Sequence, residues 1–392
     1  MTALLIFAIA LLVAVLLSKL ADRSVLSMAV LFLAAGFLCG PGMLEFIALQ
    51  PQDPVVQRLA ELALFSILFT DGMRLNLREL TSNWRLPGRA LLVGLPLTLL
   101  GTAVLAHYVA GLSWLEALLV GAILSPTDPV FAAAIIGRSD IPPRLRHLLH
   151  VESGLNDGLA LPIVLALMAF VSHAALHAAE LAGELALGIA LGAAVPWAGC
   201  RLEQSRFFAV GKRYEPLFAF SLGLLVLALA LLTHATLYLA AFAAGITVAT
   251  VRSDLRDEFH QFGEIVAELL KLAALLVFGV LMSPNFLAEV PLSGYLFAAL
   301  ALLVVRPIAI ALSLVRSRLG WRERITAGWF GPKGFASVIY GLLIVQAAVP
   351  GADRMFHLVG VVVAGSMVAH SSTDVLFARW FRRTEGDLKL QQ

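Results

Sequence analysis

The side chains best suited to chemistry lie close together in an otherwise apolar stretch. Glu152, Ser153, Asn156 and Asp157 fall within two helical turns, and the chain beyond them is apolar to about Val171. Helical residues four apart share a face, so Glu152 lies with Asn156, and Ser153 lies with Asp157. A carboxylate inside a membrane costs about 2.5–3.5 kcal/mol on insertion scales and is retained mainly where it is used. This face could form half of an oxygen-lined cation site, with Asp157 as its leading candidate.

A second polar stretch interrupts an apolar segment about thirty residues earlier. Ser125-Pro126-Thr127-Asp128-Pro129 lies inside residues 115–136, which are long enough to span a bilayer. Each proline removes an N–H and clashes with the preceding turn, which frees backbone carbonyls at membrane depth. Such a break is tolerated where it lines a cavity, and broken helices recur as ion-binding elements of secondary transporters. We therefore expect this break to supply the other half of the site.

Composition places the elements that carry these residues in a membrane. Of the 392 residues, 60% are hydrophobic and 14% are charged, and the mean hydropathy is +0.90. A soluble domain carries about 25% charged residues, so we expect an all-α polytopic membrane protein. We count thirteen apolar spans: 2–18, 24–40, 56–71, 89–110, 115–137, 147–171, 181–202, 213–232, 234–251, 264–283, 291–314, 324–348 and 356–378.

Basic residues alternate between the two sides of this arrangement. The loops after the odd-numbered spans, together with the C-terminal segment, hold 23 of the 28 Lys and Arg residues. Because basic residues accumulate in cytoplasmic loops, we expect an inner-membrane protein with its N-terminus outside and its C-terminus in the cytoplasm. The net charge of +2 then reflects these loops, and the sequence holds no basic module for nucleic acid.

A second punctuated span lies in the C-terminal half. Gly331-Pro332-Lys333-Gly334 interrupts the apolar span 324–348. Interrupted segments at corresponding places in two halves point to an inverted-repeat transporter. We expect the fifth and twelfth spans to be discontinuous helices that cross near the middle of the membrane.

These motifs resemble those of the cation/proton antiporter-1 family, the NhaP-type prokaryotic antiporters related to animal sodium/hydrogen exchangers. The matching pieces are Ser125-Pro126-Thr127-Asp128-Pro129-Val130, Glu152-Ser153-Gly154-Leu155-Asn156-Asp157-Gly158, the intramembrane Arg306, and Gly331-Pro332-Lys333-Gly334. The Asn-Asp pair and the Thr-Asp-Pro break are specific in combination. By the order of its spans, the likeness covers essentially the whole chain.

The resemblance implies a role for each side chain of the site. Asp157 would bind the transported cation and a proton in turn. Glu152, Ser153 and Thr127 would complete the site, with Asp157, Ser153 and Thr127 as Na⁺ ligands, and Asp128 would act through water. Asn156 would tie the sixth span to the broken fifth span, and Arg306 would compensate the carboxylates of the core. Lys333 stands where many relatives have Arg, which puts a bidentate contact there in doubt.

The resemblance also implies the organisation of the chain. Residues 1–380 would form the antiporter domain, followed by a short cytoplasmic tail over 381–392. Spans 1–3 and 8–10 would form the scaffold of a homodimer. Spans 4–6 and 11–13 would form the moving, ion-translocating core.

Three of these side chains also have ordinary structural explanations. Asp157 could pair with Arg306 or with a backbone N–H. Glu152 could contact the cation directly, or it could pair with Arg306, whose buried guanidinium needs an anionic partner. Asp128 could cap the half-helix that follows its own break. The sequence leaves these alternatives open.

Other features favour structural roles. Glu268 and Lys271 are three residues apart on an expected helix, which favours an ion pair. The Gly188-Ile-Ala-Leu-Gly192 motif favours close helix packing. Asp71, at the edge of the third span, has no clear assignment.

The leading functional hypothesis is electroneutral exchange of Na⁺, or Li⁺, for H⁺ by alternating access. Burial disfavours a charged carboxylate and a bound cation favours it, so proton and metal ion compete for Asp157. Asn156 stands where an electrogenic relative would carry a second Asp, which suggests one proton per cation. These ions are substrates, and we expect neither an enzyme activity nor a cofactor.

Other functions have weaker support. Exchange of K⁺ for H⁺ is the alternative transport reaction, since oxygen ligands alone do not determine size selectivity. An intramembrane protease is disfavoured because prolines flank Asp128 and no plausible triad surrounds Ser125 or Ser153. A passive channel would need a selectivity filter, and the sequence contains no filter-like loop.

Overall fold

The described part of the chain is helical. The computed structural model describes residues 2–18, 27–75, 84–128, 141–172, 178–205 and 207–389, and these ranges contain no strand. The chain forms two compact units. Unit 1 comprises Met1–Gln57, Arg85–Ser153 and Leu272–Gln392, and unit 2 comprises Arg58–Trp84 and Gly154–Lys271.

The helices follow the apolar spans read from the sequence. Those of the first half are α1 (Thr2–Leu16), α3 (Met28–Cys39), α4 (Pro54–Arg74), α6 (Arg85–Arg89), the π-helical turn η1 (Ala90–Gly94), α7 (Leu95–Tyr108), α8 (Trp114–Ile123), α10 (Pro143–Val171) and α11 (Ala178–Glu203). Those of the second half are the 3₁₀ turn η2 (Lys212–Tyr214), α12 (Glu215–Thr233), α13 (Leu237–Val251), α14 (Ser253–Leu281), α15 (Pro284–Glu289), α16 (Leu292–Leu300), the π-helical turn η3 (Ala301–Val305), α17 (Arg306–Ser313), α18 (Trp321–Trp329), α19 (Phe335–Gln346) and α20 (Ala352–Lys389).

Each of the thirteen expected spans contains at least one of these helices. Within the described ranges, six helical segments are long and apolar enough to cross a membrane, and five shorter apolar helices accompany them. The all-α polytopic fold predicted from the sequence is therefore confirmed. The expected second half of span 5, after Asp128, lies outside the described residues. The last helix, α20, continues to Lys389, past the expected end of its span at residue 378.

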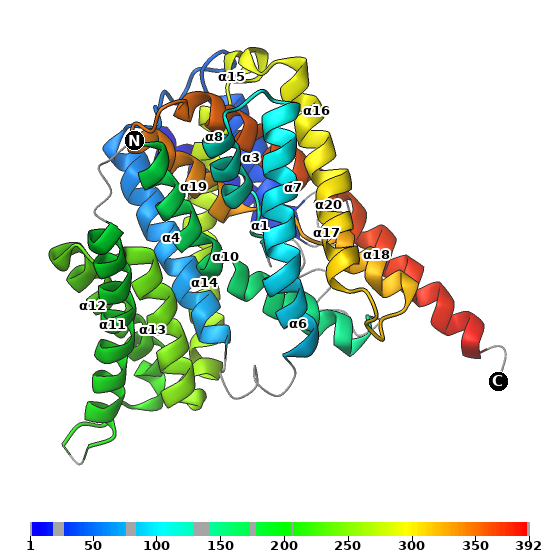
Figure 1. Cartoon of the computed structure of the whole chain (residues 1–392). Helices are drawn as coiled ribbons and strands as arrows, with labels where there is room; N and C mark the ends of the chain where they lie inside the picture. The colour runs from blue at the N-terminus through cyan, green and yellow to red at the C-terminus, as the bar shows by residue number, and fades with distance from the viewer. Residues whose placement is uncertain are drawn as a thin grey trace. The chain divides into compact units, whose positions relative to one another are not determined.

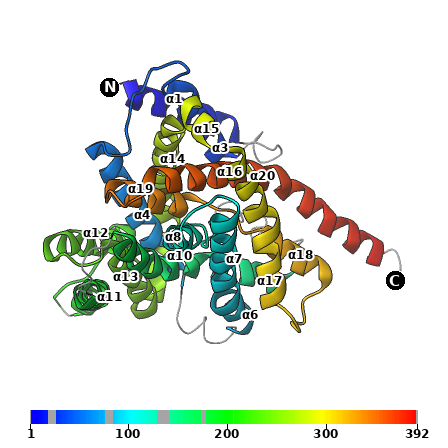
Figure 2. The same cartoon turned by 45° about the horizontal axis from the view of Figure 1, so that its top comes forward.

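Unit 1 contains two irregular spans at corresponding places. In the fourth span, η1 leads into α7, and in the eleventh span, η3 leads into α17. Proline occupies the second position of each following helix, as Pro96 and Pro307. Proline lacks the N–H of a regular turn and clashes with the carbonyl four residues earlier, and a wider π turn relieves both constraints. Figures 1 and 2 both show α7 beside α16 and α17, so the two irregular spans pack together.

Unit 2 is built around α11, α12 and α13, which pack against one another (Figure 1). A Cβ atom on Gly192 would lie 2.3 Å from the carbonyl oxygen of Ala240 on α13. The close packing predicted from the Gly188–Gly192 motif is thus confirmed.

A cluster of charged residues lies where α11 and α13 end and α14 begins. Arg252 forms ion pairs there with Glu203 and Asp254. The hydrogen bond from Arg252 lowers the pKa of Asp254 below its usual value.

Candidate functional site

The two breaks meet within unit 1. The first follows the end of α8 at Ile123, and the second separates α18 from α19 over residues 330–334. The backbone N–H of Asp128 donates to the carbonyl oxygen of Pro332 at 2.9 Å. The predicted crossing of the fifth and twelfth spans is therefore confirmed, and each break provides a partner for a backbone group that the other leaves outside a helix.

Charged side chains neutralise the helix ends at this crossing. The Asp128 carboxylate accepts a hydrogen bond from the backbone N–H of Phe335, the first residue of α19, at 3.2 Å. Lys333 Nζ lies 3.3 Å from the carbonyl oxygen of Ser125 and 3.4 Å from that of Pro126, just past the C-terminal end of α8. Because a helix is positive at its N-terminus and negative at its C-terminus, each charge is placed at the complementary end.

Asp128 therefore caps a different helix from the one that the sequence suggested. A cap on the half-helix after its own break falls outside the described residues. In the structure the carboxylate caps the start of α19, about two hundred residues further along the chain. Proximity in sequence favours a local cap, whereas the crossing brings a distant helix N-terminus to the same carboxylate.

Two glycines allow charged side chains to lie against the second break. A Cβ atom on Gly334 would lie 2.0 Å from Cβ of Asp128, and one on Gly331 would lie 1.4 Å from Nε of Arg306. Side chains at these positions would displace Asp128 and Arg306. The Gly-Pro-Lys-Gly motif thus supplies space for Asp128 and Arg306 as well as a break in the helix.

Glu152 and Arg306 form a buried ion pair. Arg306 Nη2 lies 2.9 Å from Glu152 Oε1, and the two side chains are 4% and 5% exposed. The pairing that the sequence left open is therefore present in the structure. The second carboxylate oxygen, Oε2, has no hydrogen-bond partner within the described part of the chain. Glu152 thus has a second carboxylate oxygen that can accept a hydrogen bond while the first pairs with Arg306.

The first break also meets α10 through two hydroxyl groups. Thr127 Oγ1 and Ser153 Oγ lie 3.3 Å apart, within hydrogen-bonding distance, and both residues are 1% exposed. Asn156 and Asp157 follow one helical turn further along α10, and both are buried. The helix is continuous through this stretch despite Pro162. Glu152, Ser153, Asn156 and Asp157 therefore lie on one continuous helix, at the spacing predicted from the sequence.

Polar residues of α20 contact the second break, and the sequence analysis did not identify them as part of the site. Ser366 Oγ accepts a hydrogen bond from the backbone N–H of Lys333 at 2.7 Å, and His370 Nε2 lies 2.9 Å from the carbonyl oxygen of Trp329. The Trp329 indole donates to Thr373 Oγ1 at 2.8 Å. These residues provide partners for groups around the break, which would be costly to leave unpaired in a membrane. Ser366, His370 and Thr373 are four and three residues apart in an apolar span. This spacing places them on one face of a helix, and it was the sequence signal that could have identified them.

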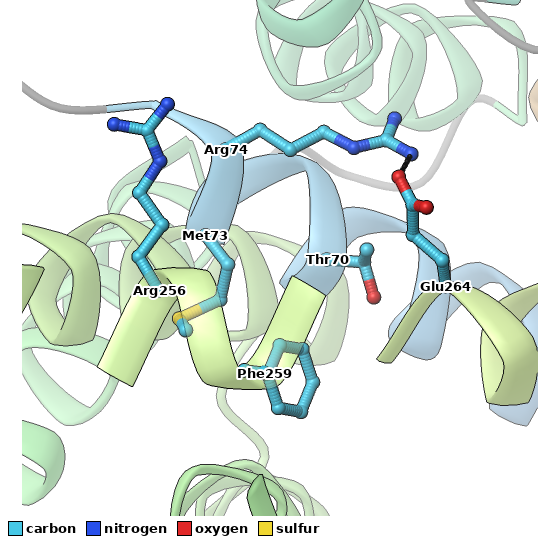
Figure 3. Close-up of a pocket in the computed structure, with 6 residues that line it drawn as sticks. All are labelled: Thr70, Met73, Arg74, Arg256, Phe259 and Glu264. Atoms are coloured by element: carbon cyan, nitrogen blue, oxygen red, sulfur yellow. Dashed lines mark hydrogen bonds and ion pairs between the residues drawn. The ribbon is translucent and has the colours of Figure 1, made fainter. Parts of the chain in front are cut away.

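A separate polar cluster in unit 2 joins α4 to α14. Arg74 pairs with Asp71 at 3.0 Å and with Glu264 at 2.5 Å, which assigns Asp71 a partner. Figure 3 shows Arg74 reaching Glu264 beside a small pocket lined by Thr70, Met73, Arg74, Arg256, Phe259 and Glu264. The ion pair predicted between Glu268 and Lys271 is confirmed at 2.5 Å.

Two breaks in membrane spans meet here, with an acidic side chain at the N-terminus of one helix and a basic side chain just past the C-terminus of another. This arrangement is typical of inverted-repeat secondary transporters. The chain belongs to the sodium/hydrogen exchanger family, whose transmembrane domain it matches over residues 7–379. The family predicted from the motifs is thus confirmed.

Curated relatives are similar over most of this chain. It is 26% identical over 356 residues to the K⁺/H⁺ antiporter NhaP of Alkalimonas amylolytica, covering 90% of this chain and 62% of that protein. It is 27% identical over 382 residues to the K⁺/H⁺ antiporter NhaP2 of Shewanella oneidensis, covering 94% of this chain and 65% of that protein. The chain thus spans just under two thirds of the length of these relatives.

A solved structure shares the fold. The sodium proton antiporter MjNhaP1 from Methanocaldococcus jannaschii, at pH 8, superposes with a TM-score of 0.75 at 18% identity, covering 96% of each chain.

Proposed function

We propose that this protein exchanges a monovalent cation for protons across the cytoplasmic membrane by alternating access. The observation that carries the proposal is the buried Asp157 on α10, one turn beyond Ser153, whose hydroxyl meets Thr127 of the first break. A buried carboxylate prefers to be protonated unless a cation replaces the proton. One group that binds either ion, and that faces each side in turn, is sufficient to couple the two fluxes.

The surrounding charges are compensated in a way that suits this reaction. Arg306 balances Glu152, and the N-terminus of α19 stabilises the charge on Asp128. Asn156 carries no charge. We therefore assign the exchanged proton to Asp157 alone, and assign Glu152, Arg306, Asp128 and Lys333 to holding the site together.

The identity of the cation has two candidates. Oxygen ligands from Asp157, Ser153 and Thr127 suit Na⁺ or Li⁺, and this is the leading assignment. Curated relatives of this chain are described as K⁺/H⁺ antiporters, which favours K⁺ as the second candidate. We further propose a homodimer, with its N-terminus outside and its C-terminus in the cytoplasm, on the strength of the motif resemblance and the distribution of basic residues.

Sealed vesicles that contain the purified protein and an imposed pH gradient test this function. Adding Na⁺ or Li⁺ outside should dissipate the gradient faster than in protein-free vesicles, because each entering cation releases one proton. K⁺ in place of Na⁺ identifies the alternative reaction, and choline serves as the control cation. If none of the three metal ions moves protons, the protein is not a monovalent cation/proton antiporter.

The proposed one-for-one stoichiometry predicts insensitivity to membrane potential. One H⁺ leaving as one Na⁺ binds moves no net charge, since Arg306 remains protonated throughout. Exchange rates should be unchanged when K⁺ and valinomycin set the potential at different values. If a potential drives Na⁺ uptake without a pH gradient, a second titrating group, Asp128 or Glu152, takes part in the exchange.

A further inference from the structure

Arginines gather where α6 approaches the loop between α17 and α18. Leu86 of α6 packs against the apolar cluster that contains Leu314 and Leu319 of this loop. Residues 85–89 and 314–324 carry six arginines and one acidic residue, Glu323. The six arginines, here called the basic patch, are Arg85, Arg89, Arg316, Arg318, Arg322 and Arg324. The patch therefore carries a strong positive charge.

Two arginines of the patch hold the loop in place. Arg89 donates a hydrogen bond to the carbonyl oxygen of Val315. Arg324 donates to the carbonyl oxygens of Ser317 and Leu319, at 2.9 and 3.2 Å. These acceptors are neutral, so they do not cancel the charges of the two guanidinium groups. The loop is thus fixed by hydrogen bonds while both arginines keep their positive charge.

The side chains of Arg316 and Arg318 lie outside this set of hydrogen bonds. Both residues are exposed, and among the described residues neither forms an ion pair or a side-chain hydrogen bond. Two guanidinium groups this close together repel each other, and an anion between them would replace the repulsion with attraction. Arginine is especially suited to phosphate, because its planar group can donate two parallel hydrogen bonds to phosphate oxygens.

Exposed apolar side chains adjoin the patch. Trp321, at the start of α18, is 62% exposed, and Ile325, one turn further along the same helix, is 49% exposed. Leu312 and Val315, near the end of α17, are exposed as well. Exposed apolar surface on membrane helices faces acyl chains, and tryptophan collects at the level of the headgroups. The basic patch therefore lies where the apolar surface of the protein meets the headgroup region.

The Trp321 ring is held in place beside the arginines. The Arg322 guanidinium lies 5.4 Å from the centroid of the Trp321 ring and 5.3 Å from that of the Trp380 ring. The two indoles are 5.2 Å apart, with planes inclined by 70°. Cation–π contacts of this kind position both the charge and the ring. An indole with one exposed side is therefore fixed next to a cluster of positive charge.

We propose that the basic patch binds the headgroup of an anionic phospholipid, with the phosphate between Arg316 and Arg318 and with Trp321 beside the upper part of the acyl chains. Clusters of basic residues next to a membrane helix attract the anionic lipids of the cytoplasmic leaflet, the side on which the proposed orientation places this loop. A soluble phosphate would match the arginines but not the exposed apolar side chains. The site is separate from the exchange reaction and does not depend on it.

Brominated lipids test this site directly, because bromine quenches tryptophan fluorescence only on close contact. The full chain is reconstituted in phosphatidylcholine vesicles that contain increasing fractions of brominated phosphatidylglycerol or brominated phosphatidylcholine. Subtracting the signal of Trp321→Phe isolates the contribution of Trp321. Half-quenching should need on the order of twentyfold less of the brominated anionic lipid, about fivefold for each of the two arginines. Both leaflets contain the probe, so the result does not depend on orientation.

Arg316→Gln with Arg318→Gln should reduce this lipid preference to near one. The loop should remain folded, because Arg89 and Arg324 still hold its carbonyl groups. Lys212→Gln with Arg213→Gln is the matched control, since it removes two exposed basic residues from η2, and it should leave the preference unchanged. A preference that survives the change at 316 and 318, or that falls equally in both double variants, overturns the site.

Two measurements on the unaltered chain provide tests that do not depend on any loop variant. Raising the salt concentration from about 0.1 M to about 1 M shortens the Debye length from about 10 Å to about 3 Å, so the preference for brominated phosphatidylglycerol should largely disappear. A preference that is independent of salt contradicts binding through exposed arginines. Glycerol phosphate, added at the same overall concentration as the lipid, should leave the quenching unchanged. If it displaces the brominated lipid, the site binds free phosphate and the assignment to a lipid is wrong.

Discussion

Replacing Asp157 with Asn should abolish cation-dependent proton movement and leave the protein folded. Asn is close to Asp in size and remains polar, so the buried position on α10 should accept it. It can neither release a proton nor offer a negative charge to a cation, and the coupling mechanism requires both. The rate at which Na⁺, Li⁺ or K⁺ dissipates a pH gradient in vesicles should fall to that of protein-free vesicles.

Glu268→Gln is the matched control for this loss. Glu268 is also a carboxylate on an expected membrane helix, but it pairs with Lys271 and its side chain is 37% exposed. This variant should retain exchange. Both variants should elute from a sizing column like the wild type. Appreciable exchange by a folded Asp157→Asn variant would show that another group carries the proton.

Replacing Arg306 with Ala should cause the largest loss of stability. The change leaves Glu152 as a buried charge without its counter-ion, and breaking such a pair costs about 3–5 kcal/mol. It also removes the side chain that lies against Gly331. The melting temperature in detergent should fall markedly, and Glu152→Gln in the same chain should restore part of the loss because no unpaired carboxylate then remains.

A double-mutant cycle measures the coupling between the two side chains. The loss in the double variant should be smaller than the sum of the two single losses. Arg58→Ala with Glu61→Gln forms the control cycle, because the Arg58 side chain is 68% exposed in its ion pair with Glu61, and an exposed ion pair contributes only about 0–1 kcal/mol. Strictly additive losses for Arg306 and Glu152 would mean that their close approach contributes nothing to stability.

Local chemistry explains why much of this protein could be predicted from its sequence. Long apolar runs form helices in a membrane because every backbone group must be paired within the protein. Prolines at 126 and 332 interrupt those helices wherever the chain folds, since the missing N–H and the ring clash are properties of the residue itself. Both breaks and the local ion pair of Glu268 with Lys271 follow from such rules and are present in the structure.

Tertiary packing alone decided which distant groups meet at the site. Asp128 caps α19, Lys333 lies at the end of α8, and Ser366 and His370 support the break from α20. None of these contacts joins residues of the same turn or the same break, so no local pattern specifies them. A broken helix leaves backbone polar groups unpaired inside a membrane protein, where each unpaired group is costly. The contacts form because the fold brings a suitable side chain close enough to pair with each of these groups.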